Sequence, residues 1–217
     1  MIFGFKNKKQ DKQASAIAYA MYCGAVKRAR QEALYKDYGI ADTIDARFDL
    51  LVLHVAMILH RLERCEDHVL AALTGQKLFD TFFQDMDQSL REKGVGDMGV
   101  PKHMKRMLEG FNGRHTSYRL AFDALENGES GASERLNDVL GRNIHRDVTS
   151  DVQDDPRPDS AAGASFDVRS LSGYVVSCLA LLGAMADDVL LSDSFSYGTG
   201  RTADADKNKE EIGGKAA

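Results

Sequence analysis

The chain has 217 residues, of which 43% are hydrophobic and 28% are charged, and its formal net charge is -5. This length and composition suit one globular domain with a core of its own, and they exclude both a membrane-embedded protein and a chain too polar to fold. The three cysteines lie far apart without C-x-x-C spacing, which favours a reducing compartment over a disulfide-stapled fold.

The charges are unevenly distributed along the chain. Residues 1–36 contain eight Lys or Arg and two Asp or Glu, so this stretch carries +6 and the remainder -11. A cationic first segment on an acidic body suits contact with the phosphates of lipid or RNA. No secretory or transit signal is visible, and the apolar stretch at 171–191 is too short to span a bilayer. We therefore expect a protein of a reducing compartment, with lipid and RNA both open as partners of its cationic segment.

Helical periodicity and a total of three prolines predict an all-α protein. The first helix is expected over 10–36, ahead of a Tyr-Gly break at 38–39. The second begins at the N-cap residues Asp-Thr at 42–43 and is apolar on more than one face, which predicts a central helix. A break at the Thr-Gly pair 74–75 precedes a third helix, which ends at Gly94.

A glycine-rich connection at 94–101 is predicted to be an elbow between two helices, because it lacks the pattern of a phosphate-binding loop. A fourth helix follows from 101 to an Asn-Gly break at 127–128. Apolar spacing predicts a short fifth helix around 136–144 and a sixth around 171–185.

The elements together predict a single-domain bundle of about six helices with flexible termini. Its parts are a basic N-terminal segment at 1–14, a helical domain at 15–191 and a disordered tail at 192–217. No internal repeat at a fixed period is present.

No arrangement typical of an enzyme emerges from the sequence. The seven-residue spacing of His54, Arg61 and His68 would place them on one stripe, yet the Glu-x-x-His pairs of di-iron bundles do not occur. Neither does a G-x-S-x-G elbow. We predict no enzymatic activity, no catalytic or metal-ligating residue, no cofactor, and neither a small-molecule substrate nor DNA as partner.

The third and fourth predicted helices carry aromatic and methionine side chains with charged residues at their margins. Such side chains adapt to irregular apolar segments of a partner, although the same spacing also suits a closed core. The predicted contact residues are Asp80, Phe82, Phe83, Met86, Asp87, Arg91, Lys93, Asp97, Lys102, Met104, Lys105, Arg106, Met107, Phe111 and Arg114.

A second predicted contact region lies in the basic N-terminal part of the chain, where it would meet a membrane surface or a ribosome. Basic residues do not by themselves distinguish lipid phosphate from RNA phosphate. The predicted residues are Phe3, Phe5, Lys6, Lys8, Lys9, Lys27, Arg28 and Arg30.

Two stretches carry a family resemblance. They are LYKDYGIADTIDARF at 34–48 and LFDTFFQDMDQSLREKGVGD at 78–97, followed by VPK at 100–102 and FNGR at 111–114. Together they resemble the ubiquinol-cytochrome c chaperone family, with similarity over about residues 15–186. Ala46 and Asn112 stand where many relatives would have Gly and Tyr.

The resemblance implies a helical domain that assists assembly of the cytochrome bc1 complex and looks after newly made cytochrome b. It implies an assembly factor without enzymatic activity, acting in a bacterium at the cytoplasmic face of the inner membrane. Three alternatives stay open: a helical module that binds ribosomes, RNA or membrane surfaces without a bc1 role, a metal or haem enzyme on a helical bundle, and an interaction module with unrelated partners.

Overall fold

The computed structural model describes residues 3–144 and 166–197, with side chains from residue 8 onward, and within these ranges it is entirely helical apart from turns and loops. Six longer helices confirm the predicted all-α bundle, and two short ones join them. The elements are α1 (Phe3–Ala29), α2 (Glu32–Lys36), α3 (Ile44–Leu62), α4 (His68–Glu92), α5 (Val100–Glu126), α6 (Ala132–Ile144), α7 (Val168–Gly183) and α8 (Asp187–Leu190).

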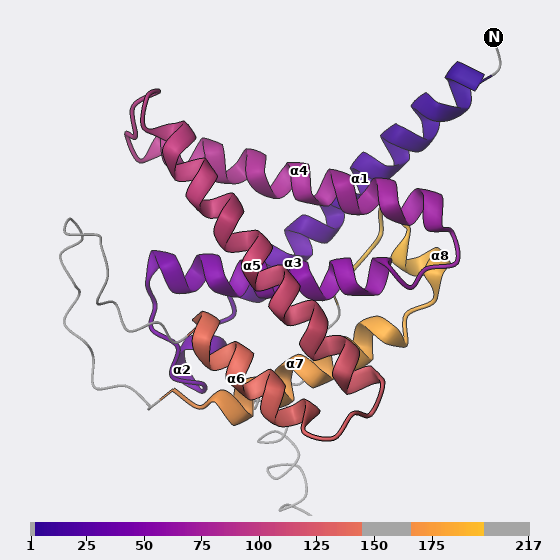
Figure 1. Ribbon diagram of the computed structural model, residues 1–217. Helices are drawn as coiled ribbons and strands as arrows, with labels where there is room; N and C mark the ends of the chain where they lie inside the picture. The colour runs from indigo at the N-terminus through magenta and orange to yellow at the C-terminus, as the bar shows by residue number, and fades with distance from the viewer. Residues whose placement is uncertain (1–2, 145–165, 198–217) are drawn as a thin grey trace, which may run out of the picture.

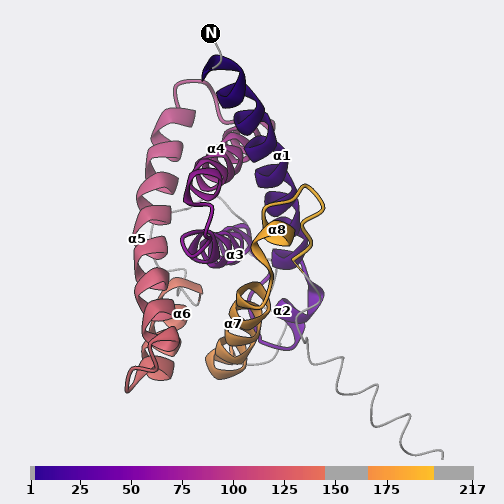
Figure 2. The same cartoon turned by 90° about the vertical axis from the view of Figure 1, so that its right-hand side faces the viewer.

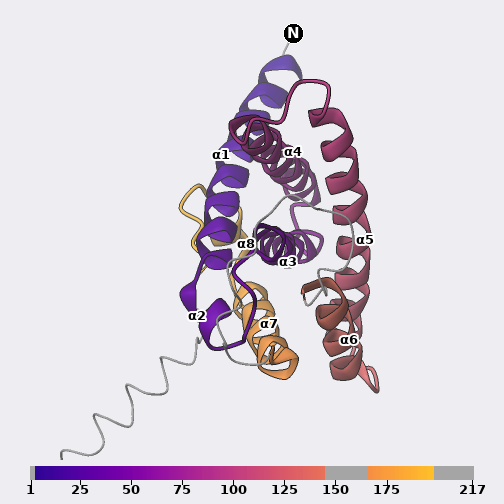
Figure 3. The ribbon, with the colours of Figure 1, turned by 90° about the vertical axis from the view of Figure 1, so that its left-hand side faces the viewer.

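Helix α3 lies at the centre of the bundle, as its apolar pattern predicts. It contacts α1, α4, α5, α6 and α7, and its side chains from Asp49 to Ile58 are all buried. Viewed along α3 and α4, α1 lies on one side of this pair and α5 on the other (Figures 2 and 3). The elbow between α4 and α5 lies at the opposite end of the molecule from α6 and α7 (Figure 1).

The ends of α3 and α4 differ in part from the prediction. Thr43 caps α3 as expected, since its hydroxyl accepts the Ala46 N–H. The predicted break at residues 74–75 is wrong: the chain turns at 63–67, and Asp67 caps α4 through the Leu70 N–H. Gly75 instead lies inside α4 and packs against α3, where this contact outweighs the weak helix propensity of glycine.

The first predicted helix is divided in two. Gln31 is extended, so α1 ends at Ala29 and α2 starts at a new angle that buries Leu34. The Tyr35 hydroxyl donates to the Ala29 carbonyl at 2.6 Å, which satisfies a backbone acceptor at the end of α1. Packing of Leu34 therefore fixes a break that helical periodicity alone does not reveal.

Residues 192–197 belong to the folded body, although the sequence places them in the tail. Phe195 and Tyr197 are buried, and Phe195 lies against Gly24 of α1. The Arg28 guanidinium donates to the Tyr197 carbonyl and lies over the Tyr197 ring. The predicted tail beyond Tyr197 lies outside the described residues.

A buried histidine joins α3 to α7. In His54, Nδ1 lies 2.7 Å from the Leu50 carbonyl and Nε2 lies 2.7 Å from the Tyr174 hydroxyl. Because a carbonyl only accepts, Nδ1 carries the proton and Nε2 accepts from Tyr174. Burial, assisted by the Arg28 charge, lowers the pKa of His54 to about 4.

This histidine predicts loss of stability in mild acid. Its folded pKa lies below the unfolded value of about 6.5, so the folded state binds fewer protons and its stability declines as the pH falls from about 6.5 towards 4. We expect His54 to account for up to about 3 kcal/mol of this decline. Urea unfolding of wild type and His54→Gln across this range measures it, and an equally steep decline in His54→Gln would contradict the assignment.

Candidate interaction surface

Four phenylalanines connect α4 to α5. The ring centroid of Phe111 lies 5.4 Å from that of Phe79, 5.2 Å from that of Phe82 and 5.6 Å from that of Phe83. Edge-to-face and tilted contacts of this kind add to the stability that burial provides. Phe82 and Phe111 are buried, whereas Phe79 and Phe83 are half-buried, so the cluster has a closed inner side and a partly open outer side.

A partly exposed apolar surface extends from this cluster towards the elbow. Because α4 and α5 run antiparallel, Met86 on α4 and Met107 and Leu108 on α5 follow one helical turn beyond the aromatic contact, and Met104 lies a turn further. We call the hairpin surface the set Phe83, Met86, Met104, Met107 and Leu108.

The α4 and α5 sides of the hairpin surface differ in packing, since Phe83 and Met86 pack against the main core. Met104, Met107 and Leu108 do not pack against the main core, and Leu108 is 38% exposed. Met98 in the elbow is 98% exposed and lies beside this region in sequence. Partly exposed methionines next to an exposed leucine suit an adaptable contact with another apolar chain.

The structure separates the six predicted apolar contact residues into two groups. Phe83, Met86, Met104 and Met107 have partly exposed side chains. Phe82 and Phe111 are in the core, so they support the surface from beneath and cannot touch a partner of the folded protein. Leu108 is the addition, and its position next to the predicted residue Met107 was the sequence signal for it.

Exposed charges organise the elbow. The Arg91 guanidinium bridges two carboxylates, with 2.6 Å from Nε to Asp87 and 2.7 Å from Nη1 to Asp97. This bridge ties the end of α4 to the loop, where Gly94 adopts the left-handed backbone conformation that glycine favours. The predicted residues Arg91, Asp87 and Asp97 are thus brought together at the rim of the hairpin surface.

The other predicted charged residues fall into two positions. Lys93, Lys102 and Arg106 are exposed and form no ion pair among the described residues, and Lys105 lies 3.9 Å from Glu109 on its own helix. These four surround the elbow. Asp80 is exposed further along α4, where it accepts a hydrogen bond from Gln76.

Arg114 has a structural role instead of a place on the rim. Its Nη2 lies 2.7 Å from the carboxylate of Asp49 on α3, and both side chains are largely buried. The guanidinium also lies over the Phe48 ring, and a Cβ at Gly110 would come within 2.7 Å of its Nη1. Arg114 therefore joins α5 to the central helix, and we leave it out of the contact surface.

The predicted basic region divides in the same way. Lys8, Lys9, Lys27 and Arg30 are exposed along or just beyond α1. Arg28 is buried against Tyr197, so it cannot contact a surface outside the folded protein. The side chains of Phe3, Phe5 and Lys6 lie outside the described residues.

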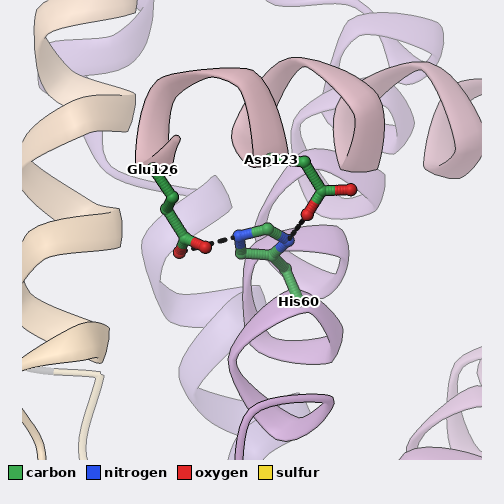
Figure 4. Close-up of side chains that lie close together, drawn as sticks. All are labelled: His60, Asp123 and Glu126. Atoms are coloured by element: carbon green, nitrogen blue, oxygen red, sulfur yellow. Dashed lines mark hydrogen bonds and ion pairs between the residues drawn. The ribbon is translucent and has the colours of Figure 1, made fainter. Parts of the chain in front are cut away.

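A polar cluster joins the C-terminal ends of α3 and α5 (Figure 4). His60 Nε2 lies 2.9 Å from Glu126, and Nδ1 lies 3.9 Å from Asp123. Arg64 lies 2.6 Å from each of these carboxylates. Burial, with Arg64, lowers the pKa of His60 despite the opposing effect of the carboxylates.

Metal binding at this cluster would compete with the arginine. The ligand atoms of His60, Asp123 and Glu126 lie within 4.8 Å of one another, close enough to surround an ion. Arg64 already neutralises part of their charge, so an ion would have to displace it. The shallow pocket beside the cluster has a volume of about 340 Å³ and is lined by charged groups that pair with their neighbours and by α7. We assign the cluster a structural role.

The fold and the comparisons define the class of protein. The sequence model of the family described as ubiquinol-cytochrome C chaperone matches residues 36–197, so the chain belongs to this family. It is similar to the protein in the crystal structure of the Cbp3 homolog from Brucella abortus, with 34% sequence identity and a TM-score of 0.66. The alignment covers 92% of this chain and 97% of that one. No curated protein matches the chain.

None of the described helices combines the length and hydropathy that crossing a membrane requires.

Proposed function

We propose that this protein is an assembly chaperone of the ubiquinol-cytochrome c reductase (bc1) complex that binds newly made cytochrome b through the hairpin surface. Membership of the ubiquinol-cytochrome c chaperone family and the similarity to a Cbp3 homolog support the assembly role. The observation that supports this binding site is the partly exposed set of methionine, leucine and phenylalanine side chains between α4 and α5.

The chemistry of an unassembled membrane subunit matches this surface. Such a client exposes apolar helix faces and charged loops before its partners cover them, so its binder needs an adaptable apolar contact with charged margins. Met86, Met104 and Met107 provide flexible, polarizable side chains for the first requirement. The bridge from Arg91 to Asp87 and Asp97, with the exposed cations of the elbow, provides the charged margins.

The proposed place of action is the surface of the inner membrane, because the client is inserted there. The exposed cations on α1 support approach to an anionic surface. A role as chaperone needs no catalytic group, and the titratable clusters at His54 and His60 are accounted for by packing between helices.

Deletion of the gene in its own organism tests the assembly role. We expect a large loss of assembled bc1 complex and of ubiquinol-cytochrome c oxidoreduction, with cytochrome b degraded or left unassembled. Complementation with the intact gene is the control. Unchanged cytochrome b and unchanged ubiquinol oxidation in the deletion strain would refute the proposed function.

A further inference from the structure

The outward side of α1 forms a continuous stripe. Its inner side, which includes Ile17, Met21 and Ala25, is buried against the bundle. The opposite side is exposed. Its residues follow one another at intervals of three and four, so they lie along one line of the helix. This outward stripe consists of Lys8, Lys9, Lys12, Ala16, Tyr19, Cys23, Lys27 and Arg30.

The charge of the stripe has one sign. Its five cations form no ion pair among the described residues, and it contains no acidic residue. Asp11, the acidic residue of α1, is beside the stripe and pairs with Lys77 of α4 at 2.8 Å. Because the chain beyond residue 36 carries -11, these cations are a local exception on an acidic protein.

The middle of the stripe is apolar. Ala16, Tyr19 and Cys23 separate the cations at its two ends, and Tyr19 is 64% exposed. Helix α1 runs along one edge of the molecule (Figure 2). At 1.5 Å per residue, the stripe from Lys8 to Arg30 is about 33 Å long. Cationic ends with a central tyrosine are the pattern of a helix that lies on a membrane surface, where lysines meet phosphates and the ring enters the headgroup region.

From this pattern we infer that the outward stripe of α1 binds the anionic phospholipid headgroups of a bilayer and orients the protein on the membrane. This inference rests on the proposed function, because the stripe would be the surface by which the chaperone reaches a client in the membrane. A lipid surface fits better than RNA because the stripe offers one aromatic ring on a convex helix, whereas single-stranded RNA is bound in basic grooves with several stacking rings.

Co-sedimentation with vesicles tests the inference on the full chain. The vesicles contain phosphatidylcholine alone or equal parts of phosphatidylcholine and phosphatidylglycerol. We expect binding to the anionic vesicles only, weakened as salt rises to about 0.15 M and beyond. The triple variant Lys9→Glu/Lys12→Glu/Lys27→Glu should bind more than about tenfold more weakly. Tyr19→Ser should also weaken binding, at unchanged charge.

A matched variant controls for net charge. Lys93→Glu/Lys102→Glu/Arg106→Glu makes the same change in charge at exposed residues of the elbow, and it should retain binding to the vesicles. Circular dichroism and thermal melting should show all variants folded. Equal loss in both triple variants, no binding by the wild type, or tighter binding of the wild type to single-stranded RNA would overturn the inference.

Capture of cytochrome b in detergent separates this inference from the proposed function. The α1 triple variant should still capture the client there, because no membrane has to be reached. Loss of vesicle binding with retained capture supports the two assignments as distinct surfaces. Wild-type protein that captures the client but binds no vesicle overturns the inference alone, and protein that binds vesicles but captures no client refutes the proposed client role alone.

Discussion

Arg61→Ala is expected to lower the free energy of unfolding by about 3 kcal/mol, because it removes a buried guanidinium that joins three helices. Arg61 Nε donates to the Leu182 carbonyl at 2.9 Å, and Nη2 donates to the Met185 carbonyl at 2.7 Å and to the Asp187 carboxylate at 2.6 Å. Without the arginine, each of these acceptors at the ends of α7 and α8 loses one hydrogen bond.

The pair with Asp187 also fixes the turn before α4. The second carboxylate oxygen of Asp187 accepts the Glu66 N–H at 2.7 Å, and this bond together with Arg61 lowers the pKa of Asp187. Removal of Arg61 therefore loosens the turn at 63–67 as well as α8. Partial exposure of Asp187 limits the cost, since water can solvate the carboxylate left behind.

Urea unfolding at neutral pH measures this effect, with Arg91→Ala as the matched control. Arg91 also bridges two partners, Asp87 and Asp97, but it is exposed, so its loss should lower the free energy of unfolding far less than the loss of Arg61. If Arg61→Ala proved as stable as Arg91→Ala, the buried network would not hold α7 and α8 on the central helix.

The sequence predicts the central helix and most helix boundaries for local reasons. Apolar residues on several faces of 44–62 require burial, and Thr43 and Gly94 mark helix ends through their own backbone and capping chemistry. The prediction of a helix break at 74–75 is wrong because the packing of Gly75 against α3 outweighs the weak helix propensity of glycine. The division of α1 from α2 depends on burial of Leu34, which is a tertiary effect.

The sequence predicts an apolar region on the third and fourth predicted helices, but it does not predict which side chains of that region are buried. Neighbours Phe82 and Phe83 point in directions about 100° apart on a helix, so which one enters the core depends on how α4 is rotated against the bundle. Arg114 and Arg91 both lie at the margin of an apolar stripe. Arg114 is buried because it pairs with Asp49, which lies 65 positions earlier in the chain. A local sequence pattern cannot predict a pair so far apart.

The hairpin surface gives the second large expected effect, loss of client capture. The variant Met104→Gln/Met107→Gln/Leu108→Gln changes three side chains of α5 that lie outside the main core, so the fold should persist. If the client covers these side chains, the lost apolar contact should weaken its capture by at least about tenfold. Val176→Gln/Leu181→Gln/Val189→Gln is the matched control, since it changes three exposed apolar side chains on α7 and α8.

Capture of radiolabelled, newly translated cytochrome b by the purified, tagged protein is the direct measurement. The two triple variants are compared with the wild type at equal concentration, after thermal melting has shown each to be folded. The binding role of the hairpin surface predicts capture by the wild type and the control variant, and its loss in the α5 variant. Undiminished capture by the folded α5 variant would show that cytochrome b does not bind this surface.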